Sequence, residues 1–423
     1  MTSSASETGS FCEIALAPWW RQGDALRRFI IDLVTAETSR LRPGAPDAGS
    51  LSPQSWRHDL RLGEAGLGFD SLERLQLATA LSEALHMHES GLADYLLARP
   101  TCGAWHDVAE ASLERFSGAI TVHTSGSTGL PKPCSHRLAE LEREVDTLQA
   151  ILTDRTRILS AVPCHHIYGF LFTILLPARL GVPLLDLRAH SPGALPSLMR
   201  PGDVIVGHPT FWSAALRAAP AGWPAQVTGV TSTAPSTIEI ADALAQAGLS
   251  RLIDIHGSSE TAGIGWRDNP RQPYQLMAHW RLGDDGRLLR DGQVGFEAPD
   301  RMEFLDAGRY RLCGRLDGAV QVGGINVFPQ RVEELLGSHP AVANIAVRLM
   351  TSAEGQRLKA FVVPHPWQTD LAQLHTELDR IAGQALTVPE RPRAYNFGLA
   401  LPTNALGKRI DWPVAQVASP PPC

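Results

Sequence analysis

TSGSTGLPK, residues 124–132, is the stretch that decides how this chain is read. It holds two glycines in nine residues and ends on Lys132, one of three lysines in a chain with 35 arginines. A β-rich run (119–124) precedes it and a helical pattern (137–145) follows. Backbone N–H groups, hydroxyls and a lysine ammonium in such a turn suit phosphate oxygens. A flexible surface loop is the alternative, and a P-loop is excluded because Leu-Pro-Lys follows Gly129.

The composition of the chain restricts the classes of protein to which it can belong. With 44% hydrophobic and 19% charged residues, the chain of 423 residues is typical of a globular protein of several domains. The net charge of −6 gives no electrostatic reason to expect nucleic acid. The most apolar run (170–187) contains two prolines and an arginine, so we expect no membrane span. Six scattered cysteines and an N-terminus without signal-peptide features favour a cytoplasmic protein with reduced thiols.

The pattern along the chain predicts an α/β fold in four parts. Residues 1–23 are irregular, residues 24–116 are helical, and residues 117–315 alternate short β-rich runs with helices, which predicts a largely parallel sheet. Residues 316–423 predict a small α+β domain. Its expected elements are a hairpin (317–329), a helix (330–339), a strand pair (344–350 and 359–365) and a second helix (370–385).

Six motifs in order resemble those of the adenylate-forming superfamily, which includes acyl-CoA synthetases, luciferases and peptide-synthetase adenylation domains. The similar stretches are TSGSTGLPK (124–132), CHHIYGF (164–170), TSTAPS (231–236), HGSSETAG (256–263), GRLDGAVQVGGINVFPQRVEE (314–334) and NALGKRI (404–410). The resemblance covers residues 119–415. It implies an adenylate-forming fold with a shortened N-terminal core domain (117–315) and a mobile C-terminal domain (316–423).

The resemblance also implies a site for ATP and Mg²⁺. For the β- and γ-phosphates it implies Thr124, Ser125, Gly126, Ser127, Thr128, Gly129 and Lys132. For adenine and the α-phosphate it implies Ser232, Thr233, Ala234, Pro235, His256, Gly257 and Ser259. Glu260 would bind Mg²⁺, and Asp300 with Arg315 would bind the ribose hydroxyls. Lys408 would bridge the substrate carboxylate and the α-phosphate, and Asp317 would be the hinge. Taken alone, a residue such as Glu260 or Asp300 is more often a surface carboxylate or a helix cap.

The acid site is expected at CHHIYGF. By resemblance to aryl-CoA ligases, His166 and Tyr168 would face the acyl group, with Phe211 as a weaker candidate. His166 thereby joins Lys408, Glu260 and Lys132 as a catalytic candidate. No charge cluster suits a substrate ammonium, so a hydroxylated aromatic acid fits better than an amino acid. A metal site formed by His165, His166 and nearby cysteines has no matching ligand spacing.

Four departures from the superfamily pattern stand out. The part before the phosphate loop is far shorter, and the stretch from Glu260 to Asp300 is compressed. His256 replaces the aromatic residue that stacks on adenine, and Gln321 replaces a lysine before the glycine turn. The last change favours weaker affinity for free CoA.

Residues 65–109 resemble an acyl carrier protein, and this combination is closest to the short ligases of aryl-polyene and xanthomonadin-type pigment clusters. Ser71, in Asp-Ser-Leu, would be the candidate phosphopantetheine site, with Leu75, Leu81 and Leu85 in the core. A simple helix N-cap is the alternative. We therefore expect an ATP-dependent ligase that passes an aromatic acyl group to an acyl carrier protein, either separate or its own N-terminal domain. The alternatives are an aryl-CoA ligase using free CoA and a non-catalytic scaffold.

Overall fold

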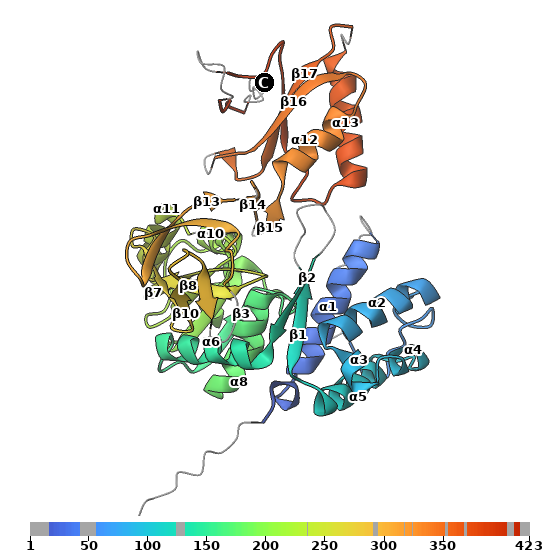
Figure 1. Ribbon diagram of the computed structural model, residues 1–423, viewed down its shortest axis with the longest axis vertical. Coiled ribbons are helices and arrows are strands. Elements are labelled where there is room, and N and C mark those ends of the chain that lie inside the picture. Colours follow the sequence, from blue (N-terminus) through green and yellow to red (C-terminus); the bar gives the residue numbers. More distant parts are fainter. Residues whose placement is uncertain are drawn as a thin grey trace, which may run out of the picture.

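The computed structural model describes most of the chain in three regions, which Figure 1 colours blue, green to yellow, and orange to red. The described residues are 17–42, 56–123, 132–234, 236–290, 295–316, 318–323, 325–351, 354–367, 370–403 and 410–414. The N-terminal helices lie beside the central sheet region, and the C-terminal part lies beyond both.

The N-terminal region is helical, as expected. The elements are the short turn η1 (Trp19–Arg21), α1 (Ala25–Leu41), α2 (Ser71–Ala84), α3 (Met87–Ser90), α4 (Tyr95–Ala98) and α5 (Cys102–Arg115). A capping box starts α2, because Asp70 accepts from the Glu73 N–H at 2.8 Å and Glu73 accepts from the Asp70 N–H at 3.0 Å. The capping function of Asp70 is therefore observed, and Ser71 is exposed beside it.

These helices share their core with the central sheet. The Phe29 ring of α1 lies 5.8 Å from that of Phe170, and one hydrophobic cluster runs from α1 through α5 into the strands. Leu81 and Leu85 are buried as expected, but the expectation for Leu75 is wrong: it is 46% exposed, because it lies on the outer face of α2. The shared core gives no support to a separately folded carrier domain, and the carrier resemblance stays a prediction.

A nine-stranded sheet forms the centre, with the order β12-β13-β9-β8-β7-β6-β5-β3-β4. Five neighbours are parallel: β3 (Arg157–Ser160), β4 (Leu184–Asp186), β5 (Asp203–Gly207), β6 (Thr228–Thr231) and β7 (Arg251–Ser258). The apolar run of β5 is buried along its whole length, as expected for a parallel strand covered on both faces. The predicted parallel sheet is confirmed for this half.

The other half of the sheet is antiparallel, which the sequence did not indicate. It contains β8 (Ala262–Arg267), β9 (Tyr274–Leu276), β12 (Asp300–Phe304) and β13 (Arg309–Arg315). Residues 259–261 form the tight turn from β7 to β8. No helix separates these strands, so the chain can only return antiparallel.

Hairpins and helices complete the central region. The hairpins are β1 (Ala119–His123) with β2 (Pro133–Arg137), and β10 (Trp280–Leu282) with β11 (Leu288–Arg290). The helical elements are α6 (Leu138–Ile151), α7 (Ile167–Phe170), the π-turn η2 (Leu171–Leu175), α8 (Leu176–Leu180), η3 (Pro192–Ala194), α9 (Leu195–Leu198), α10 (Pro209–Ala218) and α11 (Ile238–Ala247). None of the helices within the described ranges has the length and apolar character needed to cross a membrane.

The C-terminal part is the predicted α+β unit. Its elements are the hairpin β14 (Val320–Val322) with β15 (Ile325–Val327), α12 (Pro329–Gly337), β16 (Val342–Leu349), β17 (Leu358–Pro364), α13 (Leu371–Ala385) and β18 (Ala394–Phe397). Leu374, Leu378 and Ala382 recur every four residues on α13 and are buried against the sheet. This unit has a hydrophobic cluster of its own.

Lys359 is fully buried in this C-terminal unit and ties residues 411–412 to it. Its ammonium donates to Glu354 at 2.9 Å, to Asp411 at 3.1 Å and to the Trp412 carbonyl. The hydrogen bond from Lys359 lowers the pKa of Glu354 from 4.5 to about 2. The ionised form of Glu354 is therefore the form that the folded state prefers.

We expect this linkage to appear in thermal unfolding. A depressed carboxyl pKa contributes stability above pH 4.5 that is lost as the pH falls toward 2. The Glu354→Gln variant should unfold at a lower temperature at pH 6 and should lose less of its unfolding temperature between pH 4.5 and 2 than the wild type. Parallel losses in both proteins would contradict the assignment.

Candidate functional site

Four segments that carry predicted site residues start at one edge of the central sheet. Because β3, β5, β6 and β7 are parallel neighbours, their carboxyl ends lie side by side. The segments that follow them are 161–168, 208–211, 232–236 and 259–262. In open α/β sheets this edge is where ligands bind.

Strand β2 brings Lys132, which is predicted to bind phosphate, to the same edge. The His136 Nε2 of β2 lies 2.7 Å from the Ser259 carbonyl, so the strand after Lys132 is tied to the turn that carries Glu260. Lys132 and Glu260 both act on the Cys134 thiol, whose pKa is raised to about 11 by burial and by Glu260, while Lys132 opposes the rise. Residues 124–129, predicted for the phosphates, lie outside the described residues.

The turn that carries Glu260 is held by its own hydroxyls. Ser258 Oγ and Thr261 Oγ1 are 2.9 Å apart, and Ser258 Oγ accepts from the Glu260 N–H at 3.2 Å. Gly257 is required by the hairpin itself, because a Cβ there would lie 2.2 Å from the Ala262 carbonyl oxygen. The Glu260 side chain is exposed. An exposed carboxylate near a lysine is a suitable ligand for a Mg²⁺ ion that also binds phosphate oxygens.

The His256 side chain lies within hydrogen-bond distance of Asp300. Its Nδ1 lies 2.8 Å from the Tyr310 hydroxyl and its Nε2 lies 3.1 Å from Asp300 Oδ2. The ring is only 6% exposed and packs beside the rings of Tyr274 and Tyr310. Both ring nitrogens are therefore engaged within the protein, and the place of His256 at the adenine stays a prediction.

Asp300 and the backbone of Arg315 are cross-strand partners on β12 and β13, so the two predicted ribose residues lie side by side. Asp317 and Lys408 lie outside the described residues. The predicted hinge and the C-terminal catalytic lysine therefore keep the status of predictions.

The predicted adenine segment is strained. Thr233 has a φ of 76°, an unusual value for a β-branched residue. Among the described residues, its buried hydroxyl has no hydrogen-bond partner. Ser232 holds the segment to β7 by donating to the Ile255 carbonyl at 2.9 Å, while Ala234 is half-buried and Pro235 lies outside the described residues. A strained residue with an unpartnered polar atom is typical of a ligand site.

Asp254 anchors the base of this region, and the sequence interpretation missed it. It accepts from Arg267 at 2.7 Å, from the Tyr274 hydroxyl at 2.9 Å and from the Ser236 N–H at 3.1 Å. Burial raises the pKa of Asp254, and Arg267 opposes that rise. The sequence feature that could have identified Asp254 is an aspartate inside an otherwise apolar strand.

The predicted acid-binding residues have different surroundings. The Tyr168 hydroxyl lies 3.0 Å from the Gly207 carbonyl oxygen and 3.2 Å from that of Val230, so it is engaged by the ends of β5 and β6. His166 has an exposed surface, although desolvation by the surrounding protein lowers its pKa. Phe211 is half-buried, and a Cβ on Gly207 would lie 2.6 Å from its ring.

His208 is a candidate that the sequence interpretation did not include. It directly follows β5, and its Nδ1 accepts from the Phe211 N–H at 3.3 Å. A neutral imidazole that accepts at Nδ1 carries its proton on Nε2, which is then free to donate to a ligand. Burial lowers the pKa of His208, so the neutral form is favoured. The sequence feature that could have identified His208 is a histidine directly after a predicted parallel strand.

Comparisons with known proteins agree with this geometry. A family model described as AMP-binding enzyme matches residues 64–329, and one described as AMP-binding enzyme C-terminal domain matches residues 331–408. A 4-coumarate–CoA ligase of Rhodobacter capsulatus is 37% identical over 399 residues, which cover 92% of this chain and 100% of the relative. A 4-coumarate–CoA ligase of Halorhodospira halophila is 36% identical over 397 residues, which cover 91% of this chain and 98% of the relative.

A solved structure with the same fold is an amide bond synthetase from Marinactinospora thermotolerans. It superposes with a TM-score of 0.57 at 18% identity, covering 91% of this chain and 92% of that one. The first family match starts at residue 64, inside the helical segment that shares its core with the sheet. From both family matches and both relatives, the chain belongs to the AMP-binding enzymes, the adenylate-forming superfamily, and is an acid–thiol ligase.

Proposed function

We propose that this enzyme activates a hydroxylated aromatic carboxylic acid with ATP as an acyl adenylate and then transfers the acyl group to a thiol. The observation that carries the proposal is the gathering of Lys132, Glu260 and Asp300 around the carboxyl edge of the parallel strands. The relatives named as 4-coumarate–CoA ligases support the aromatic class of acid.

The first half-reaction joins two anions, which sets what the residues must do. A carboxylate oxygen of the acid attacks the α-phosphorus, and pyrophosphate leaves with the electron pair of the broken P–O bond. Mg²⁺, when bound, supplies positive charge to the phosphate oxygens. Lys132 adds a fixed cation on the leaving phosphates, Asp300 orients the ribose, and Lys408 is proposed to stabilise charge on the reacting oxygens.

The acid site is proposed to lie beside Tyr168, His166, His208 and Phe211. Aromatic side chains there favour a flat ring, and the imidazoles of His166 and His208 suit a phenol hydroxyl. Desolvation by the surrounding protein lowers the pKa of each imidazole, so the neutral form is favoured. A neutral imidazole binds a hydroxyl without requiring a charged substrate group.

The two lysines should give different kinetic defects. Lys408→Ala should lower pyrophosphate release by about 10²–10³-fold with little change in ATP affinity, because its contact matters mainly in the transition state. Lys132→Ala should raise the KM for ATP and lower the rate together. Arg409→Ala is the matched control, a neighbouring cation without a proposed role. Unchanged pyrophosphate release in Lys408→Ala would contradict the assignment.

Substrate preference tests the acid class. In a pyrophosphate-release screen, hydroxylated benzoic or cinnamic acids should give a higher kcat/KM than acetate, fatty acids or amino acids. His208→Phe and His166→Phe should reduce the preference for hydroxylated over unsubstituted rings, because they remove the hydroxyl partner and keep the ring volume. A medium-chain fatty acid as the best substrate would overturn the aromatic proposal.

The acceptor thiol is proposed to be that of CoA. A cleft of about 420 Å³ lies between α10 and the C-terminal unit, with Thr210, Ser213 and Arg217 on one side and Gly323, Ile325 and Arg357 on the other. Thr210 and Phe211 are both in α10, so the cleft and the proposed acid site share this helix. Arginine side chains there suit the phosphates of CoA. Gln321, which replaces a lysine of the superfamily, is an argument against CoA because it favours weaker affinity for free CoA.

A carrier protein is the second candidate acceptor, as in the short pigment-cluster ligases. The exposed Ser71 at the start of α2 favours it. The core that α2 shares with the sheet argues against Ser71 as a swinging arm, because the helices would have to leave that core to reach the site. A separate carrier protein remains compatible with the same adenylating chemistry.

The thioester half-reaction, started from supplied acyl adenylate, separates these acceptors. With CoA as acceptor, Arg217→Ala should raise the KM for CoA by about tenfold, whereas Arg271→Ala, in an exposed ion pair with Asp242, should not. An unchanged KM for CoA in Arg217→Ala, together with a gain of one phosphopantetheine mass that Ser71→Ala abolishes, would instead support the carrier reading.

A further inference from the structure

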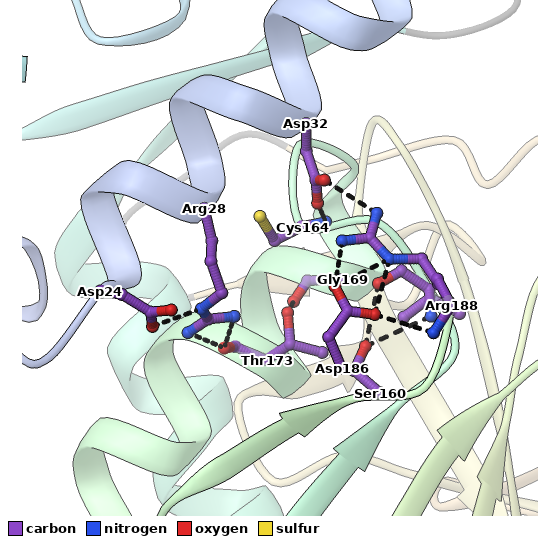
Figure 2. A network of polar contacts seen from close by, with 10 residues as sticks. Asp24, Arg28, Asp32, Ser160, Cys164, Gly169, Thr173, Asp186 and Arg188 are labelled. Atoms are coloured by element: carbon purple, nitrogen blue, oxygen red, sulfur yellow. Dashed lines mark hydrogen bonds and ion pairs between the residues drawn. The ribbon is translucent and has the colours of Figure 1, made fainter. Parts of the chain in front are cut away.

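Helix α1 places two charged residues against the segment that contains the proposed acid-binding residues. Arg28 and Asp32 are four residues apart, so they lie on one face of the helix. Arg28 is 9% exposed and Asp32 is 6% exposed. Figure 2 shows both side chains pointing from α1 toward Cys164, Thr173 and Arg188.

Asp32 joins the start of this segment to the end of β4. One carboxylate oxygen accepts from the Cys164 N–H at 2.7 Å, and the other accepts from Arg188 at 2.8 Å. Arg188 in turn donates to Asp186, the last residue of β4. Asp32 is therefore the point at which α1, β4 and the backbone two residues before His166 are joined (Figure 2).

Arg28 holds the other end of the segment. Its guanidinium donates to the Thr173 carbonyl at 3.2 and 3.1 Å. In a regular α-helix that carbonyl would accept from the residue four positions later, which is Pro177 and has no N–H. The chain forms a π-turn at Leu171–Leu175 instead, and Arg28 supplies the donors.

The segment between these two contacts is tightly packed. A Cβ on Gly169 would lie 1.8 Å from the Pro163 carbonyl oxygen, so α7 lies directly on the backbone that leads into it. Thr173 also donates through its hydroxyl to the Gly169 carbonyl at 2.7 Å. A shift at either end would therefore move His166 and Tyr168 relative to the strand ends.

We propose that Asp32 and Arg28 of α1 are positioning residues for the acid-binding segment 164–173. The inference rests on the proposed function for the place where the acid binds. Asp32 holds the first residue of the segment in place, and Arg28 holds its π-turn. Neither side chain needs to touch the acid. Helix α1 thus positions the acid-binding segment through these two side chains.

Asp32→Asn is the sharpest test, since it keeps the shape of the side chain. Its amide oxygen can accept only one of the two bonds, and its NH₂ group would face either an N–H or the Arg188 guanidinium. We expect the KM for the acid to rise about tenfold while the KM for ATP stays within about twofold. Arg28→Lys, which keeps the charge and loses the fork, should show a smaller rise.

Glu37→Gln is the matched control. It makes the same chemical change on the same helix, at a carboxylate that pairs locally with Arg40. It should leave both KM values unchanged.

Alkylation of Cys164, mapped by peptide mass spectrometry, gives a second reading that does not depend on activity. The Cys164 thiol is 2% exposed, and burial raises its pKa well above the ordinary value, so it should react slowly in the wild type. The Asp32 carboxylate also raises this pKa, so the rates are compared after correction for the thiolate fraction, which the pH dependence of alkylation gives. The corrected rate should rise several-fold in Asp32→Asn and should not change in Glu37→Gln.

The outcomes separate this inference from the proposed function. Every kinetic comparison uses the best acid found in the screen, so a fatty acid as best substrate would overturn the aromatic proposal and still allow the KM test. A fall in kcat with both KM values unchanged, and a lower unfolding temperature, would mean a purely structural role and would overturn the inference. Unchanged Cys164 alkylation would overturn it as well.

Discussion

The parallel run of β3, β5, β6 and β7 is the constraint on which the site depends, because it forces four connecting segments to begin at one edge of the sheet. The chain then reverses at residues 259–261, and the antiparallel strands return past the same edge. That reversal places Glu260 at the edge and allows β12 to bring Asp300 to His256 of β7. A parallel continuation would have required a crossover helix at this position.

The site is supported by buried charges that are each paired. Asp254 is held by Arg267 and Tyr274, and Asp32 is held by Arg188. Such pairs contribute little to stability by themselves, because the desolvation of two charges offsets their attraction. Removing one partner would leave a buried charge without compensation, so each pair stays together. The pairs thereby fix the relative positions of the elements that carry them. We infer that this is why arginine, with its fixed fork of donors, serves these two pairs.

Local patterns predicted the elements but not the contacts between distant ones. The hairpin at 317–329 and the helices of the C-terminal unit follow from turn residues and apolar spacing, and the structure agrees. The antiparallel strands β12 and β13 were missed because most of their side chains are polar and lie at least partly exposed, so they lack the buried apolar run of the parallel strands. Asp32 was missed for a different reason: its partner Cys164 lies 132 residues away, and no local pattern joins them. Tyr168 was assigned to the acid from resemblance, whereas its hydroxyl is engaged by strand carbonyls.

The central claim is that a carboxylate oxygen of the acid attacks the α-phosphorus of ATP. An acid labelled with ¹⁸O in its carboxylate tests this directly, because thiol attack on the acyl adenylate releases AMP with the oxygen that came from the acid. The account predicts one ¹⁸O atom in AMP for each thioester formed and none in pyrophosphate, as read by mass spectrometry. Unlabelled AMP, or ADP and phosphate as products, would contradict it.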